Sequence, residues 1–273
     1  NGVMSAVELL LETQLSGDQK SKLNLALTSA EALLALINDL LDISRVEAGQ
    51  LSLECVPFDI EQLLETAVKT LDIKARKKGI SLILHYSPNT PHLIMGDPIR
   101  IWQVIANLLS NAIKFTDQGS INIKVWAEGV TPDGLTLFIS VKDTGIGIST
   151  EDLEHIFDTF YQSNIRKDIV LQGTGLGLAI CRQLVKMMKG SLVVDSEVDA
   201  GSTFTLQVSF PRPNQKEILE ALSSGRFWIR GNLPSFTHIS DPSFPEKDHQ
   251  PPVEKEQPKP LVLVAEDNVI NQK

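Results

Sequence analysis

The chain has 273 residues with 34 acidic and 25 basic side chains, so its formal net charge is -9. This acidic balance argues against a nucleic-acid-binding protein, which needs clustered Lys and Arg to displace counterions from phosphates. Hydrophobic residues make up 42% of the chain, enough to bury a sizeable core, whereas aromatic residues at 5% are too sparse for a base-stacking surface.

Cys55 and Cys181 lie far apart in the sequence and have no partner pattern, so neither a disulfide framework nor a zinc site is predicted. Such cysteine use is typical of a reduced, cytoplasmic setting. No apolar stretch approaches the roughly 18 residues of a membrane span, and Asn1 does not open a signal sequence. Because position 1 is not Met, we expect a fragment of a longer protein.

The first segment predicts a truncated helical hairpin, which we assign to residues 1–54. Residues 3–15 form the shorter helix, and a turn at 16–18 precedes a longer helix whose small and apolar residues recur at spacings of three and four. These positions are Leu23, Ala26, Ala30, Leu33, Ile37, Leu40 and Ser44, widened by Leu27, Leu34 and Leu41. Two helices cannot bury so wide a face, so the pattern predicts a dimer that closes a four-helix bundle.

The second segment, residues 55–212, mixes helical and strand patterns. Helices are predicted at 58–77, 97–115 and 175–188, and strands at 80–86, 120–127, 135–142, 191–196 and 203–210. A hairpin signal at Pro132-Asp133-Gly134 joins two of these strands. The fold class is therefore α+β, with a helical hairpin followed by a two-layer α/β sandwich.

The last quarter of the chain differs in composition. Nine of the fourteen prolines fall within 211–260, so we interpret 213–260 as a flexible linker with one short helix at 215–222. Residues 261–273 then begin with Leu261-Val262-Leu263-Val264, which predicts a buried strand.

The first candidate constellation lies on the predicted helix 97–115. Asn107, Asn111 and Lys114 share one face at helical spacing. Amide oxygen suits a hard cation such as Mg²⁺, and Lys114 suits a phosphate. The alternative is an exposed polar face with a solvated lysine.

The second constellation, Asp143-Thr144-Gly145-Ile146-Gly147, directly follows a predicted strand. Glycine lets the backbone turn sharply and approach a ligand, and a carboxylate in a cleft accepts a hydrogen bond from an amino group such as that of adenine. A simple Asp-Gly turn is the alternative.

The third constellation, Gly173-Thr174-Gly175-Leu176-Gly177, opens a predicted helix. Glycine-rich backbone at a helix N-terminus offers N–H groups and a positive dipole end to phosphate, although a merely glycine-rich helix start is the alternative. The spacing differs from the dinucleotide fingerprint, and neither a P-loop nor the protein-kinase motif set occurs.

Taken together, in this order and spacing, the three constellations resemble the N, G1 and G2 boxes of the sensor histidine kinases, members of the gyrase-like ATPase superfamily. The four residues from Phe157 to Phe160 match the F box, and Gly201-Ser202-Thr203-Phe204 match the closing glycine-rich turn. The resemblance runs from residue 1 to about 210 and is closest to hybrid kinases. It implies transfer of the ATP γ-phosphoryl group to a His of the dimerisation hairpin and relay to a receiver Asp.

The resemblance also implies a role for each matching residue. Asn111 coordinates Mg²⁺ with Asn107 beside it, and Lys114 contacts the ATP phosphates. Asp143 binds the adenine amino group. The remaining ATP-binding positions are Gly145, Gly147, Phe157, Phe160, Gly173, Thr174, Gly175, Leu176, Gly177 and Thr203.

The resemblance implies that Gly173, Gly175 and Gly177 flank a mobile lid anchored by Phe157 and Phe160, and that motion of this lid gates transfer. Arg166 and Lys167 lie within the lid, where they either approach phosphate or remain solvated charges.

The phosphoacceptor of the family lies in an H-E-x-x-x-P-[LM] stretch, a few residues before an Asn-Gly like Asn1-Gly2. None of the five His residues of this chain is followed by Glu or lies on the predicted hairpin. We therefore expect the acceptor to precede residue 1, and expect this fragment to bind ATP without autophosphorylating at that site.

The tail from Leu263 onwards resembles the first strand and the acidic pair, Glu266 and Asp267, of a receiver domain. These carboxylates serve a metal site in a complete receiver and are otherwise a solvated acidic pair. The implied partners are a second copy of the chain and a receiver domain or response regulator. The resemblance implies no nucleic-acid partner, and it places the parent on the cytosolic face of the inner membrane through segments outside this chain.

Two alternatives remain at this point. A hydrolytic ATPase of the gyrase or mismatch-repair type resembles these kinases but has a Glu four residues before the metal-binding Asn, where this chain has Asn107. A non-catalytic nucleotide-binding or dimerisation scaffold is the other alternative.

Overall fold

The computed structural model describes residues 2–162 and 174–224. Five of the candidate functional residues therefore lie outside the described part: Arg166, Lys167, Gly173, Glu266 and Asp267. So do most of the predicted linker and the predicted strand that begins at Leu261.

The described chain begins with a helical hairpin of α1 (Gly2–Leu11) and α2 (Gly17–Glu47). Ser16 has an extended backbone, and its hydroxyl accepts a hydrogen bond from the Gln19 N–H while the Gln19 side chain accepts one from the Ser16 N–H. This capping box requires a break before α2. The first helix accordingly ends at Leu11 and not, as the sequence suggested, at residue 15.

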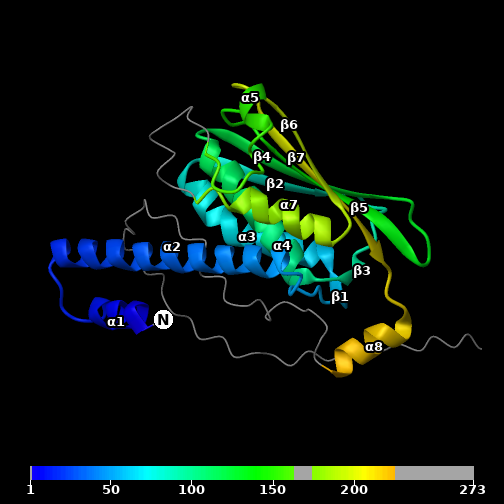
Figure 1. Cartoon of the computed structure of the whole chain (residues 1–273), viewed down its shortest axis with the longest axis horizontal. Coiled ribbons are helices and arrows are strands. Elements are labelled where there is room, and N and C mark those ends of the chain that lie inside the picture. Colours follow the sequence, from blue (N-terminus) through cyan, green and yellow to red (C-terminus); the bar gives the residue numbers. More distant parts are fainter. Residues whose placement is uncertain (1, 163–173, 225–273) are drawn as a thin grey trace, which may run out of the picture. The chain divides into compact units, whose positions relative to one another are not determined.

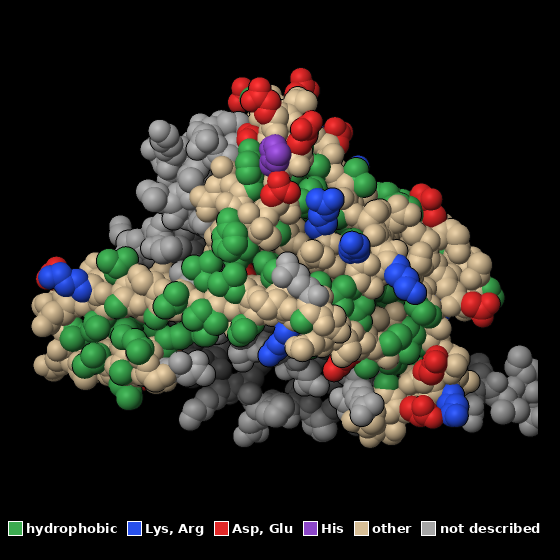
Figure 2. All heavy atoms as spheres, in the orientation of Figure 1, with side chains coloured by type: hydrophobic (Ala, Val, Ile, Leu, Met, Phe, Trp, Pro, Cys, Tyr) green, Lys and Arg blue, Asp and Glu red, His purple; other side chains and the backbone are tan. Residues whose placement is uncertain are grey.

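The hairpin exposes many apolar side chains, which Figure 2 shows as hydrophobic spheres along α1 and α2. The exposed large hydrophobic residues on these helices are Val3, Leu9, Leu10, Leu25, Leu33, Ile37, Leu40 and Leu41. Two other α2 residues, Leu36 and Ile43, pack against the core of the following region.

That region is a two-layer sandwich (Figure 1). Its sheet has the order β2-β4-β5-β7-β6, with β2 parallel to β4 and the other pairs antiparallel. The strands are β2 (Ile80–Tyr86), β4 (Gly119–Glu128), β5 (Gly134–Asp143), β6 (Ser191–Glu197) and β7 (Gly201–Pro211). The helical layer consists of α3 (Ile60–Lys77), α4 (Pro98–Phe115) and α7 (Gly177–Met187). The predicted α+β class with its sandwich is confirmed.

Three small elements were not predicted. β1 (Val56–Asp59) pairs antiparallel with β3 (Leu93–Gly96), and α5 (Thr150–Leu153) forms a single turn. The sequence assigned residues 58 and 59 to a helix, which was wrong because Asp59 caps α3 by accepting the Gln62 N–H at 2.9 Å. The short helix near the end of the described chain is α8 (Gln215–Ser223).

The core lies between the sheet and the helical layer. On β4, Ile121, Ile123 and Val125 are fully buried at every second position, as expected for a strand with one face on a core. Ten residues of α4 are buried on one side, including Ile101, and the opposite side of this helix remains polar. Each fully buried side chain of this size contributes about 1.5–3 kcal/mol to stability. Among the described residues, none of the helices combines the length and apolarity that a membrane span requires.

Candidate nucleotide site

Helix α4 carries the first constellation, and its start is fixed by Asp97. This buried carboxylate accepts the N–H groups of Ile99 and Arg100 at 3.1 Å through one oxygen, and the Glu54 N–H at 3.1 Å through the other. Pro98 follows in the first helical turn, where its missing N–H costs nothing. Asn107 and Asn111 then lie half-buried one turn apart on the polar face.

The other end of α4 is held by Lys78, a residue that the sequence did not single out. Its Nζ donates to the carbonyl oxygens of Ile113 at 2.9 Å, Lys114 at 3.1 Å and Thr116 at 3.4 Å. A cation here satisfies the unpaired carbonyls at the C-terminus and the negative end of the helix dipole. No local pattern signals this role, because Lys78 follows α3 and the carbonyls are more than thirty residues further along.

Asp143, at the end of β5, has only 5% of its surface exposed. Its Oδ1 accepts the Gly145 N–H at 2.8 Å and the Ser202 N–H at 3.3 Å. Burial raises the pKa of this carboxyl, and the backbone hydrogen bonds from Gly145 and Ser202 act in the opposite direction by favouring the ionised form. The loop after β5 thus presents a fixed hydrogen-bond acceptor.

The glycines of this loop are needed for close backbone contacts. Gly147 has φ +68, and any side chain on it would collide with the carbonyl oxygen of Glu197 at the end of β6. The Ile146 N–H donates to the Phe115 carbonyl at 3.2 Å, and the Ile146 carbonyl accepts the Asp199 N–H at 2.8 Å. The loop is therefore held between the end of α4 and the β6–β7 turn.

The third constellation meets the F box through the backbone. The Phe160 N–H donates to the Gly175 carbonyl at 2.9 Å, and both residues have positive φ. A side chain on Gly175 would lie 2.7 Å from the carbonyl carbon of Phe160. Phe157 packs partly buried against the core, whereas Phe160 is 61% exposed. The predicted helix start at residue 175 was wrong, because the left-handed backbone there delays α7 to Gly177.

The start of α7 lies against the polar face of α4. A side chain on Gly177 would sit 3.3 Å from Oδ1 of Asn107. Leu176 is fully buried, and its N–H donates to the Thr174 hydroxyl at 3.1 Å. Within the part of the chain that the structure describes, no side chain caps the first turn of α7, so its N–H groups can donate to an acceptor.

Two predicted residues lie at the margins of this arrangement. Lys114 is half-buried, with its Nζ 4.8 Å from the centre of the Phe115 ring. Thr203 lies on β7 opposite Lys142 of β5, next to the Ser202 that binds Asp143. The structure thus brings α4, the 143–147 loop and the start of α7 together. The Ile146 N–H bonds to the Phe115 carbonyl, and Gly177 lies close to the Asn107 side chain.

The chain matches two described protein families. Residues 96–212 match the histidine kinase-, DNA gyrase B- and HSP90-like ATPases, and residues 1–49 match the His Kinase A (phospho-acceptor) domain.

Individual relatives agree with these matches. The chain is 39% identical over 209 residues to the signal transduction histidine-protein kinase BarA of Escherichia coli K12, covering 77% of this chain and 23% of BarA. It is 38% identical over 226 residues to hybrid signal transduction histidine kinase B of Dictyostelium discoideum, covering 82% of this chain and 12% of that protein. Full-length ShkA in complex with AMPPNP is similar in structure, with a TM-score of 0.65, 31% identity, and coverage of 78% of this chain and 43% of ShkA.

The chain therefore belongs to the sensor histidine kinases, as its motifs predicted, and it contains the ATP-binding kinase core of that family. Its relatives include hybrid kinases. The chain spans about a quarter or less of the length of these two curated relatives.

Proposed function

We propose that the chain binds ATP with Mg²⁺ between α4, the 143–147 loop and the start of α7, and serves transfer of the γ-phosphoryl group to a His of a dimerisation hairpin. The phosphoryl group would then pass to an Asp of a receiver domain or response regulator. The observation that carries this proposal is that Gly177 at the start of α7 lies close to Asn107 of α4, near enough that an added Cβ would be 3.3 Å from the amide oxygen, so an amide-bearing helix face lies beside a helix N-terminus.

The residues on the polar face of α4 fit a hard cation. Among the described residues, no group of three His, Cys, Asp or Glu side chains could hold a metal ion. Amide oxygen is a suitable Mg²⁺ ligand, and Mg²⁺ usually completes its shell with phosphate oxygens and water. Asn111 would hold the ion, and Lys114 would contact phosphate. The bound ion supplies positive charge that offsets the phosphate charges during transfer.

The base of the nucleotide would be recognised by Asp143. Its buried carboxylate is oriented by the two backbone N–H groups of Gly145 and Ser202, so it presents an acceptor of fixed direction to the adenine amino group. Gly147 would keep the loop narrow enough for the ring to approach the backbone. Phe160 and Gly175 would hold together the two chain ends that flank residues 163–173.

The neutral amide of Asn107 argues against a hydrolytic ATPase. Activation of water requires a group that removes a proton, and an amide side chain is not a base. Asn107 would instead orient ligands beside Asn111. Phosphoryl transfer to an imidazole depends on positioning and charge neutralisation, for which these residues are suited.

The decisive experiment uses radiolabelled ATP and Mg²⁺ with two proteins, this chain and the same chain extended N-terminally by an H-E-x-x-x-P-[LM] stretch. We expect labelled protein only from the extended chain, because the described helices α1 and α2 contain no His. Release of inorganic phosphate by both proteins, without labelling, would favour the hydrolytic ATPase. If neither protein is labelled and neither binds nucleotide, only the scaffold alternative remains.

A further inference from the structure

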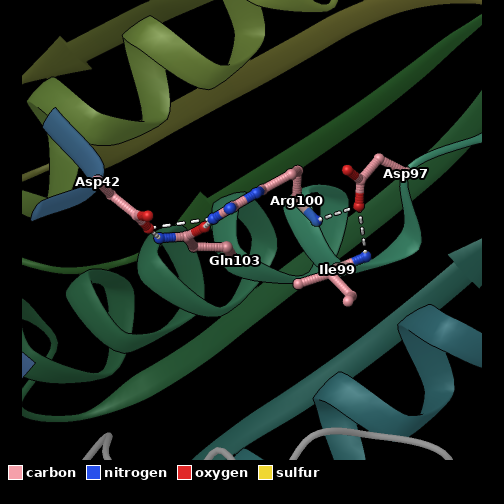
Figure 3. A network of polar contacts seen from close by, with 5 residues as sticks. All are labelled: Asp42, Asp97, Ile99, Arg100 and Gln103. Atoms are coloured by element: carbon pink, nitrogen blue, oxygen red, sulfur yellow. Dashed lines mark hydrogen bonds and ion pairs between the residues drawn. The ribbon is translucent and has the colours of Figure 1, made fainter. Parts of the chain in front are cut away.

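The C-terminal half of α2 contacts α4 through a compact polar network (Figure 3). Nη1 of Arg100 donates to Oδ2 of Asp42 at 3.0 Å and to Oε1 of Gln103 at 2.8 Å. Nε2 of Gln103 donates to the same Asp42 oxygen at 3.0 Å. One carboxylate oxygen of α2 is thus shared by two donors of α4.

This network is shielded from solvent. The side chains of Arg100 and Asp42 are only 21% and 18% exposed, whereas those of Lys22 and Asp18, another ion pair of α2, are both 74% exposed. Exposed pairs contribute little because water and salt screen them, and shielded charge-assisted hydrogen bonds are stronger. We therefore expect the contact of Asp42 with α4 to contribute more to stability than an exposed ion pair does.

The position of Arg100 on α4 connects this contact to the nucleotide site. Arg100, Gln103, Asn107 and Asn111 follow one another at spacings of three and four, so they form a single stripe along the helix. The first two bind α2, Asn107 lies beside the start of α7, and Asn111 is the proposed metal ligand. Because Asp97 and Lys78 fix both ends of α4, the helix acts as a rigid element between these two contacts.

Neighbouring residues of α2 reach α7 as well. Ile43 lines a hollow together with Phe157 and with Ala179 and Arg182 of α7. Burial raises the pKa of the Cys181 thiol of α7, and the negative charge of Asp39, one turn before Asp42, raises it further. The network of Asp42 thus lies within a junction between α2 and both helices that border the nucleotide site.

We propose that Asp42, Arg100 and Gln103 form a docking contact that sets the orientation of the ATP-binding domain on α2, and that Arg100 and Gln103 are positioning residues for phosphoryl transfer. In-line transfer requires the donor and acceptor atoms to be aligned closely, and small misplacements lower the rate strongly. The role in transfer rests on the proposed function, whereas the docking contact stands on the network alone.

The first test is a charge swap in this chain. Asp42→Arg and Arg100→Asp are made singly and together, with Asp18→Arg in the same helix as the matched control. Hydrogen exchange of the backbone amides in the last turns of α2 is followed by mass spectrometry, and ATP affinity by calorimetry. We expect roughly tenfold faster exchange in each single variant, the effect of losing one charge-assisted contact, and recovery in the double variant. ATP affinity should stay the same in all variants, and Asp18→Arg should leave the exchange rate in the last turns of α2 unchanged.

A milder variant keeps the test valid if a charge reversal prevents folding. Asp42→Asn preserves the size of the side chain and removes its charge, and it should also speed exchange in the last turns of α2. The docking contact would be overturned if Asp42→Asn and the folded single variants exchange at the unchanged rate. It would also be overturned if the double variant folds but does not recover the slow exchange of the original chain.

The second test addresses transfer, in the chain extended by the H-E-x-x-x-P-[LM] stretch. We expect the labelling rate to fall in the single variants without a change in KM for ATP, and to rise again in the double variant. A rate that is unaffected by all three variants would overturn the positioning role. If the unsubstituted chain binds no ATP, the proposed function fails, and the exchange measurements still decide the docking contact.

Discussion

At the scale of single residues, the candidate site depends on backbone groups held in place by a few side chains. Asp143 is fixed by the N–H groups of Gly145 and Ser202, and the end of α4 is fixed by one ammonium group, that of Lys78. The contact of Asp143 with Gly145 is local, whereas the contacts of Asp143 with Ser202 and of Lys78 with α4 join distant parts of the chain. Substitutions here are therefore expected to act on nucleotide binding through the backbone as well as through lost side-chain contacts.

The role of Asp143 is tested by Asp143→Asn. Asparagine can still accept the Gly145 and Ser202 N–H groups through its oxygen, but its amino group cannot accept a hydrogen bond from adenine. We expect ATP affinity measured by calorimetry to fall roughly 10- to 100-fold, the loss of one buried hydrogen bond to a charged group. The exposed Asp133→Asn serves as the control. Equal affinities of the two variants would refute the adenine assignment.

The conformation of Gly147 allows a matched comparison with Gly129. Both have positive φ, at +68 and +58, but a side chain on Gly129 would meet no atom within 4 Å, whereas one on Gly147 would collide with the Glu197 carbonyl. Gly129→Ala should destabilise the protein by about 1 kcal/mol, the strain of a left-handed alanine. Gly147→Ala should cost at least ~3 kcal/mol in urea unfolding, because the β6–β7 turn must move. Similar losses would contradict the close packing of the loop.

At the scale of elements, α2 combines an apolar face with acidic residues that approach α4 and α7. Asp39 is half-buried there. Burial, helped by the nearby charge of Asp42, raises the pKa of Asp39 from 3.8 to about 6. An ionised carboxylate in such a place is less stable than in water. The packing of α2 is therefore expected to depend on pH.

The sign of this dependence follows from proton linkage. Because the pKa of Asp39 is higher in the folded state, the folded protein binds the proton more tightly, and the free energy of unfolding should rise as pH falls from above about 6 towards 3.8. Urea unfolding of the chain and of Asp39→Asn across this range isolates the contribution. The difference in stability between the two proteins should shrink as pH falls. A constant difference would show that Asp39 is not buried in solution.

At the scale of the whole molecule, the apolar residues of α1 and α2 are not all covered by the chain itself. Leu33, Ile37 and Leu40 recur at the spacing of a helical seam and are between 43% and 59% exposed. A second hairpin would bury them in a four-helix bundle. The match of residues 1–49 to the phospho-acceptor domain family agrees with this expectation.

Dimerisation is tested by sedimentation of the chain at increasing concentration. We expect a dimer that dissociates on dilution, and we expect Ile37→Glu to be monomeric because it places a charge in the seam. Asn38→Glu, also exposed on α2 and adjacent in sequence, is the matched control and should remain dimeric. A chain that stays monomeric at high concentration, or equal behaviour of the two variants, would contradict the bundle.

Local patterns in the sequence determined the longer helices, the long strands and the three constellations, because periodicity and glycine spacing are properties of short segments. They also determined the family, since the boxes occur in a fixed order. The short strands β1 and β3 escaped detection because a four-residue strand is specified by its partner and not by its own pattern.

Only the tertiary structure decided how these segments meet. The contacts of Lys78 with α4, of Asp143 with Ser202 and of Asp42 with Arg100 join residues separated by more than thirty positions. Such contacts depend on the packing of the helical layer against the sheet and of α2 against that layer. The physical reason is that a hydrogen bond needs donor and acceptor within about 3 Å, and only the folded chain sets that distance.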